Sequence, residues 1–192
     1  PFSAMTLRIP VIYGSVRAGR QGIKVARFVE RQLRGRGHEV TLVDPLQEQL
    51  PLLERRFKDY QPGTAPAALE RLAELYRQAD AFVIVSGEYN HSVPPALTNL
   101  LDYFLEEYSF RPSGIVSYSS GAYAGVRATV QLREMLCALG MPSIPATLPV
   151  PKVQTVATDD GSATDPSLER RFSRFASELE WYAEALKTQR EK

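Results

Sequence analysis

The chain has 192 residues, 44% of them hydrophobic, which is enough for one well-buried domain and short for two. Its 23 Lys and Arg nearly balance its 22 Asp and Glu, so net charge gives no reason to expect binding to nucleic acid or to a membrane surface. No apolar stretch is long enough to span a bilayer, and the first residues lack the apolar core of a signal peptide. We therefore expect a cytoplasmic protein with one domain over residues 1–192, an extraneous or disordered start at 1–5 and a frayed tail at 188–192.

The first half of the chain alternates apolar runs with amphipathic segments. Residues 7–13 and 38–43 predict two strands, because the first run is mainly apolar and the second alternates apolar with polar residues. Helices are expected at 23–36 and 65–78, where apolar residues recur on one face. Residues 44–63 contain three prolines and predict a long irregular connection, which often covers a site or a subunit contact.

The second half continues the same pattern. The apolar run at 81–85 predicts a buried parallel strand. The other expected elements are helices at 96–107, from about 126 to 139 and at 167–187, and strands at 113–118 and 143–148. The repeated order of strand and helix predicts an α/β fold, a doubly wound five-stranded parallel sheet with helices on both faces.

The expected helix at 96–107 is more apolar around its circumference than contact with one face of a sheet requires. Its large apolar side chains are Leu97, Leu100, Leu101, Tyr103 and Phe104. A helix with apolar residues on more than one face needs a second surface to cover it. We therefore expect a homodimer or homotetramer that uses this helix as its contact face.

Three loops fall at the carboxyl ends of predicted strands, the edge of an open α/β sheet where ligands bind. The first, residues 14–22, suits a phosphate: its glycines permit close approach of the backbone, the following helix presents free N–H groups, and Ser15, Arg17 or Arg20 can donate to an anion. Its glycine spacing matches neither a P-loop nor a dinucleotide-binding motif. A terminal monoester phosphate fits best, and an ordinary glycine-rich turn with solvated arginines is the alternative.

The other two loops, residues 86–95 and 119–125, offer small polar side chains and backbone amides, which suits a planar ring with donors and acceptors along its edge. No Ser-His-Asp set is apparent, because His38 lies away from this edge and no nucleophile accompanies His91. Two histidines and one cysteine, far apart in sequence, lack the spacing of a metal site. Cys137 is expected in the core.

Three groups of residues carry a resemblance to a known family. They are Gly14-Ser15-Val16-Arg17 with Gly19, Arg20 and Gly22; Gly87-Glu88-Tyr89-Asn90-His91-Ser92-Val93-Pro94 with Leu97, Asn99 and Asp102; and residues 119–125 with Arg127, Ala128 and Gln131-Leu132-Arg133. Together they resemble the NAD(P)H-dependent FMN reductase family, which has the flavodoxin-like fold and includes quinone, chromate and azo-dye reductases. The resemblance runs in register from residue 7 to residue 145, and the middle motif is its most specific part.

The resemblance implies a set of cofactor-binding residues. Those that would hold the FMN phosphate are Ser15, Arg17, Arg20, Gln21 and Gly22. Those that would line the isoalloxazine ring are Glu88, Tyr89 and Asn90, and those that would meet its pyrimidine side are Ser119, Ser120 and Gly121. Many relatives have Ser and Asn or Thr at the positions of Arg20 and Gly22, so the phosphate contacts here differ from the commoner pattern.

The resemblance also implies an activity, the passage of two electrons from NADPH or NADH through bound FMN to a small acceptor such as a flavin, quinone, chromate or azo compound. Donor and acceptor would use the same ring face in turn. The flavin carries the chemistry, so no side chain is expected to be catalytic, while His91, Tyr123 and Arg127 are expected to contact substrate. A non-enzymatic flavodoxin-like electron carrier and a flavin-free binding protein stay open as alternatives, although the balanced charge argues against the carrier.

Overall fold

A computed structural model describes residues 5–192 of the chain. Five parallel strands form one sheet in the order β2-β1-β3-β4-β5, which is the flavodoxin-like order and confirms the predicted fold class. The strands are β1 (Arg8–Tyr13), β2 (Glu39–Val43), β3 (Phe82–Ser86), β4 (Ser113–Tyr118) and β5 (Ser143–Val150). Of the expected start at 1–5, residues 1–4 lie outside the described part of the chain.

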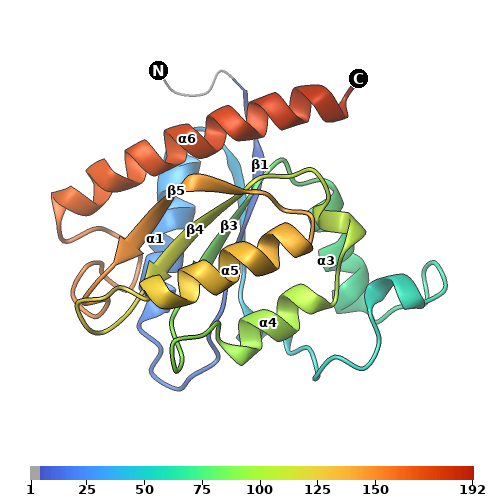
Figure 1. The fold of residues 1–192 in the computed structure, drawn as a ribbon, viewed down its shortest axis with the longest axis horizontal. Coiled ribbons are helices and arrows are strands. Elements are labelled where there is room, and N and C mark those ends of the chain that lie inside the picture. Colours follow the sequence, from blue (N-terminus) through green and yellow to red (C-terminus); the bar gives the residue numbers. More distant parts are fainter. Residues whose placement is uncertain (1–4) are drawn as a thin grey trace.

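Helices cover both faces of this sheet (Figure 1). They are α1 (Gly22–Gly35), α2 (Pro45–Glu48), α3 (Ala67–Arg77), α4 (Pro95–Asp102), α5 (Val126–Ala138) and α6 (Pro166–Arg190), with short 3-10 turns η1 (Phe57–Asp59) and η2 (Glu106–Tyr108). Helix α6 is longer than predicted and includes residues 188–190, which the sequence analysis placed in a frayed tail.

Two hydrophobic cores lie on opposite faces of the sheet. Side chains of a strand point alternately to its two faces, so each apolar run supplies both cores. Helices α1 and α6 pack on one face against Val11, Val83 and Val116. Helices α3, α4 and α5 pack on the other face, where the strands contribute residues such as Ile12 and Ile84.

Pro10 lies in β1, an internal strand, although proline lacks the N–H that a ladder uses. Its position in the register explains why the strand tolerates it. The pairing of β1 with β3 begins only at Val11, opposite Val83, and Arg8 on the same side of β1 bonds Asp80 instead of a strand. The missing N–H therefore falls before that ladder starts.

The expected helix at 96–107 is wrong in its length and in the reason given for a subunit contact. Helix α4 ends at Asp102, and the chain then turns into η2. This turn brings Phe104 and Tyr108 against Tyr76, with ring centroids 5.0 and 5.3 Å away. The five large apolar side chains on which that expectation rested are buried within the chain itself, at 0–3% exposure, so they are not available to cover a second subunit.

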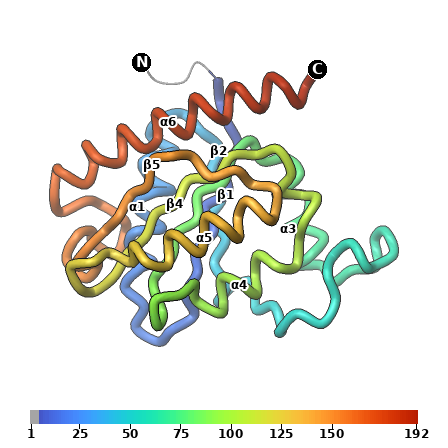
Figure 2. Tube along the Cα trace, viewed as in Figure 1, coloured from blue at the N-terminus to red at the C-terminus, as the bar shows by residue number. Residues whose placement is uncertain are grey.

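The irregular segment before α3 packs beside α4 and contributes to the same side of the molecule. The side-chain amide of Asn99 accepts a hydrogen bond from Leu53 N at 2.9 Å and donates one to Pro51 O at 2.7 Å. Figure 2 shows the remainder of the segment, in cyan to teal, projecting beyond α3. Two polar bonds to one side chain thus hold part of a connection that has little regular structure.

No helix within residues 5–192 has both the length and the apolar composition that crossing a membrane requires.

Cys137 of helix α5 is exposed, contrary to the expectation that it lies in the core. Leu132, Leu136 and Leu139 occupy the buried side of α5 and its end, and Cys137 is rotated about 100° from Leu136 along the helix.

Candidate functional site

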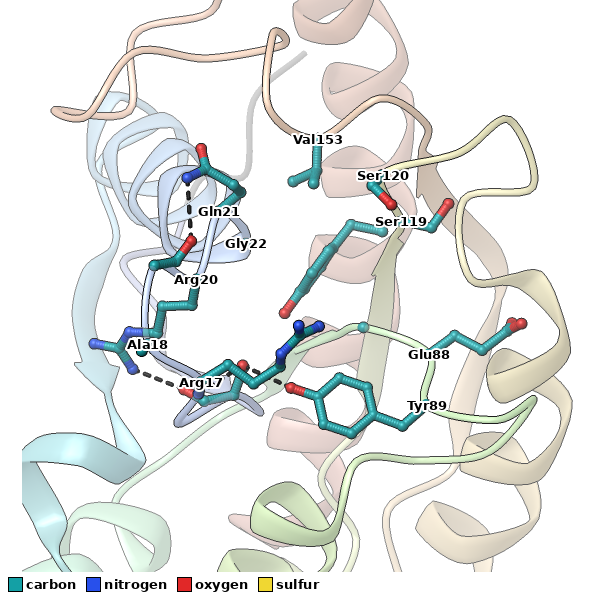
Figure 3. A pocket seen from close by; sticks show the side chains of 14 residues that line it. Arg17, Ala18, Arg20, Gln21, Gly22, Glu88, Tyr89, Ser119, Ser120 and Val153 are labelled. Atoms are coloured by element: carbon teal, nitrogen blue, oxygen red, sulfur yellow. Dashed lines mark hydrogen bonds between the residues drawn. The ribbon is translucent and has the colours of Figure 1, made fainter.

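A cavity of about 350 Å³ opens at the carboxyl end of the sheet, where the predicted loops meet. Its walls come from Ser15 and residues 17–22 after β1, residues 87–89 after β3, residues 118–120 at the end of β4, and Val153 after β5. Figure 3 shows these side chains around the opening. The three predicted loops therefore line one cavity, and a fourth segment joins them.

The first loop is folded tightly around Ser15, which is buried at 3% exposure. Gly14 N donates to Val85 O at 3.1 Å, which ties the loop to β3. The Ser15 hydroxyl lies 2.9 Å from the Tyr89 hydroxyl and accepts a bond of 3.4 Å from Arg17 N. Ser15 and Tyr89 therefore meet across the cavity, and the Tyr89 hydroxyl faces the first loop.

Arg17 points into the cavity, and its guanidinium carbon lies 5.8 Å from the centre of the Tyr89 ring (Figure 3). Among the described residues no carboxylate forms a salt bridge with Arg17. The neighbouring N-terminus of α1 has no side-chain cap at Gln21, whose amide donates to Gly19 O instead. An unpaired cation beside an uncapped helix N-terminus makes a site that favours an anion.

Arg20 lines the same cavity but its charged group is turned away from it (Figure 3). Two guanidinium nitrogens donate to the two carboxylate oxygens of Asp44, each at 2.5 Å, and one also donates to Ser15 O at 2.7 Å. The hydrogen bonds from Arg20 to Asp44 raise the pKa of Arg20. The structure thus pairs Arg20 with a carboxylate, unlike the free phosphate donor that the sequence analysis expected.

Gly22 is required by the ring of Tyr118. A Cβ placed on Gly22 would lie 2.1 Å from Cζ of Tyr118, and one on Gly87 would lie 3.2 Å from the same ring. The Tyr118 hydroxyl donates to the Tyr13 hydroxyl at 3.3 Å, and burial raises the pKa of Tyr118. Two glycines therefore make room for one aromatic side chain at the cavity floor.

The loop after β3 forms a two-residue hairpin. Tyr89 and Ser92 exchange both backbone hydrogen bonds, at 3.0 and 2.9 Å, and Asn90 and His91 between them have positive φ angles of 50° and 64°. These angles are those of a type I′ turn. Asn90 and His91 are exposed at the tip and are absent from the cavity walls, so the structure places Tyr89 but not Asn90 at the site.

Glu88 connects this hairpin to helix α5. One carboxylate oxygen accepts from Arg127 N at 3.0 Å and from Ala128 N at 3.1 Å, and the other lies 3.6 Å from the Arg127 guanidinium. Gln131 of the same helix bonds the Ser92 hydroxyl and His91 O. The Glu88 side chain therefore satisfies the N-terminus of α5, and the hairpin is held by two contacts with one helix.

The turn after β4 is bound to the segment after β5. Ser119 N donates to Val150 O at 3.2 Å, and Val153 N donates to Ser119 O at 3.0 Å. Ser119 and Ser120 line the cavity, whereas Gly121 does not. Val153, which is 4% exposed, becomes part of the wall through this pairing.

Tyr123 and Arg127 lie outside the cavity walls. The Arg127 guanidinium carbon lies 5.1 Å from the centre of the Tyr123 ring, and that ring is 68% exposed. With His91 they occupy the loop tips and the start of α5. The structure therefore separates these three expected substrate contacts from the enclosed part of the site.

Two wall residues, Tyr118 and Val153, were not predicted from the sequence. Tyr118 is the last residue of β4, and its position at a strand's carboxyl end was a usable signal. Nothing in the local sequence marks Val153, because its place depends on pairing with residues more than 30 positions earlier. No three His, Cys, Asp or Glu side chains within residues 5–192 are grouped in a way that would hold a metal ion.

Comparisons with known proteins show which family the chain belongs to. Residues 7–155 match the family described as NADPH-dependent FMN reductase. A quinone reductase of Pseudomonas putida is 31% identical over 180 residues, which cover 88% of this chain and 92% of that protein. An NAD(P)H-dependent FMN reductase of Saccharomyces cerevisiae is 28% identical over 151 residues, covering 70% and 76% of the two chains.

Solved structures share the fold at lower identity. FerB, a flavoenzyme NAD(P)H:acceptor oxidoreductase from Paracoccus denitrificans, has a TM-score of 0.73 at 22% identity, over 92% of this chain and 99% of that chain. A flavodoxin mutant from Pseudomonas aeruginosa has a TM-score of 0.58 at 18% identity, over 89% and 97%. The structural matches support the flavodoxin-like fold, and the sequence matches assign the chain to the NADPH-dependent FMN reductase family of oxidoreductases.

Proposed function

We propose that the cavity binds FMN and that the chain passes electrons from NAD(P)H to a small acceptor. The observation that carries the proposal is Arg17, an unpaired guanidinium directed into the cavity beside the uncapped N-terminus of α1. A terminal phosphate would satisfy both groups. The cavity volume of about 350 Å³ also falls within the range of cofactor sites.

The other residues of the cavity would contact both the phosphate and the ring of FMN. The Ser15 hydroxyl and the Tyr89 hydroxyl lie at the same end of the cavity as Arg17. Because the two hydroxyls bond each other, one O–H group and the Arg17 guanidinium would be free to donate to the proposed phosphate. The backbone around Gly87 and Tyr89 and the turn of Ser119 and Ser120 form the opposite walls. These walls would contact the isoalloxazine ring and its pyrimidine side.

Bound FMN would supply the redox chemistry, because it accepts a hydride from NAD(P)H and passes two electrons to an acceptor. The chain's part is to orient the ring and to offer N–H donors to its edge. No side-chain acid or base is needed in the enclosed site. The exposed group of His91, Tyr123 and Arg127 is suited to contact the nucleotide or the acceptor at the rim.

The acceptor we place first is a quinone, since the related protein from Pseudomonas putida is a quinone reductase. Flavin, chromate and azo compounds are the other candidates. We also propose that the protein is a homodimer or homotetramer. A contact through the segment 96–107 would use its partly exposed residues, because its five large apolar side chains named above are buried within one chain.

Absorbance under anaerobic conditions tests the proposal. Purified protein titrated with FMN is expected to bind it, and the flavin bands are expected to bleach promptly on addition of NADPH or NADH and to return on addition of benzoquinone. A protein that takes up no FMN would contradict the whole proposal. A protein that binds FMN but is not reduced by either nucleotide would be an electron carrier instead.

A further inference from the structure

The guanidinium of Arg20 is engaged in contacts within the chain, which a side chain that binds a phosphate would have to give up. The Arg20 guanidinium forms a bidentate ion pair with Asp44 and donates to Ser15 O. The guanidinium carbon also lies 5.2 Å from the centre of the Tyr13 ring. Arginine side chains form such paired bonds with carboxylates because the two planar groups match. Every one of these contacts is within the chain.

Asp44 is equally committed. It is 4% exposed, stands at the carboxyl end of β2, and also accepts a hydrogen bond from Leu46 N at 3.0 Å as the cap of α2. Releasing Arg20 toward a ligand would leave this buried carboxylate without its counter-charge. Breaking a buried pair costs more than one phosphate contact returns, so Arg20 stays with Asp44.

The contacts of Arg20 have a geometric result at the first loop. They join Ser15 O, in the loop after β1, to Asp44, at the end of β2. Only one residue separates Ser15 from Arg17, whose backbone N–H also bonds the Ser15 hydroxyl. Arg20 therefore fixes the backbone from which the two proposed phosphate donors project.

We propose that Arg20 and Asp44 are a positioning pair, which holds the first loop in the shape that receives the phosphate while Arg17 supplies the charge. This inference rests on the proposed binding of FMN. It assigns different tasks to two arginines only three residues apart. It also gives Asp44, which is not itself a wall residue of the cavity, a role in cofactor affinity.

The variant Asp44→Asn separates the two roles by the sign of its effect. Asparagine can still cap α2, but it removes the counter-charge of Arg20. If Arg20 were a phosphate donor held back by Asp44, this variant would free it and FMN would bind more tightly. If the pair positions the loop, FMN binds more weakly, and we expect its dissociation constant to rise about tenfold.

The experiment measures the dissociation constants of FMN and riboflavin for the wild type, Asp44→Asn, Arg20→Ala and Arg17→Ala. Riboflavin lacks the phosphate, so the dissociation constant of riboflavin divided by that of FMN isolates the phosphate contribution from general damage to the cavity. We expect this ratio to fall in all three variants. Tighter FMN binding by Asp44→Asn, or an unchanged ratio in that variant, would overturn the inference.

Arg71→Ala is the matched control. It removes another arginine–carboxylate pair, between Arg71 and Glu48 at the end of the same short helix α2, without touching the first loop. Its ratio is expected to equal that of the wild type, and a fall would mean that any disturbance of α2 has the same effect. Failure of the wild type itself to bind FMN would contradict the proposed function and not this inference alone.

If Asp44→Asn does not fold, the variant Arg20→Lys distinguishes a positioning role from a role of charge alone. Lysine keeps the positive charge but cannot reproduce the two-pronged bond. The positioning role predicts a lowered ratio in Arg20→Lys despite the conserved charge. A wild-type ratio in this variant would mean that charge alone matters at position 20, and would overturn the inference.

Discussion

Charged side chains are paired differently at the amino and carboxyl ends of the sheet. At the amino end Arg36 forms a two-pronged bond with Glu180, at 2.5 and 2.7 Å, and His38 also bonds Glu180, at 2.9 Å. A second cluster there joins Asp80 to Lys187 and Arg190. At the carboxyl end the guanidinium of Arg17 enters the cavity and has no carboxylate partner within residues 5–192.

This difference separates charges that maintain the fold from charges left for a ligand. At the amino end cations of α6 or of the turn before β2 meet carboxylates across more than 100 residues of sequence. At the carboxyl end Arg20 and Asp44 form a similar complete ion pair, whereas Arg17 has no carboxylate partner within residues 5–192. A pair that is already complete stabilises the protein, whereas an incomplete one is available for binding.

The largest expected effect comes from breaking the amino end. Glu180→Ala removes the carboxylate that pairs with Arg36, whose side chain is 7% exposed, and truncating one member of a buried ion pair costs about 3–5 kcal/mol. Urea unfolding should record this loss of stability. Glu169→Ala, which removes an exposed carboxylate of the same helix, is the control and should change stability by less than about 0.5 kcal/mol. Equal effects of the two substitutions would remove the distinction.

Low pH should reduce the stability that Glu180 contributes at the amino end of the sheet. Burial alone would raise the pKa of Glu180, but hydrogen bonds from Arg36 and His38 lower it to about 2, below its ordinary value of 4.5. Because the folded-state pKa is the lower one, the stabilisation is complete above pH 4.5 and is lost as the pH falls toward 2. The free energy of unfolding measured from pH 5 to pH 2 should therefore fall more steeply for the wild type than for Glu180→Gln. Parallel curves would contradict this assignment.

A smaller effect is expected from filling the space beside Tyr118 at the carboxyl end. Gly22→Ala places a methyl group 2.1 Å from the Tyr118 ring, and overpacking of this kind costs about 1–3 kcal/mol. Both the free energy of unfolding and the affinity for FMN should fall. Gly35→Ala, at the other end of the same helix, has nothing within 4 Å of the new Cβ and should be neutral or stabilising by up to about 1 kcal/mol. Normal FMN binding by Gly22→Ala would show that the cavity can relax.

The most selective effect is expected at Arg17. Arg17→Ala should weaken FMN binding by about 1–3 kcal/mol, the cost of a lost charge-assisted contact, while the free energy of unfolding stays within about 0.5 kcal/mol of the wild type. Fluorescence titration and urea unfolding provide the two values. Arg31→Ala, which removes an exposed arginine of α1, should change neither. A loss of stability in Arg17→Ala would place this residue with the fold-maintaining charges.

Much of the architecture could be predicted because its signals are local. Strand β4 begins and ends at the predicted residues, and α1, α3 and α5 differ from prediction by one or two residues at most of their ends. The segment 96–107 was misjudged because its composition resembles a helix throughout. The aromatic contacts of Phe104 and Tyr108 with Tyr76, which end α4 early, involve residues about 30 positions apart.

The order of strands and helices, the loops that meet at one edge of the sheet and the chemical character of those loops could be predicted, since periodicity and parallel connections follow from local residues. The folded structure was needed to show which arginine of the first loop has no carboxylate partner within residues 5–192, because the partner of Arg20 is a carboxylate at the end of another strand. It also decided that Tyr118 and Val153 form walls and that the residues of the α4 segment face inward. A charge pattern states what a loop can bind, and the contacts made across the fold determine which of its charges remain available to do so.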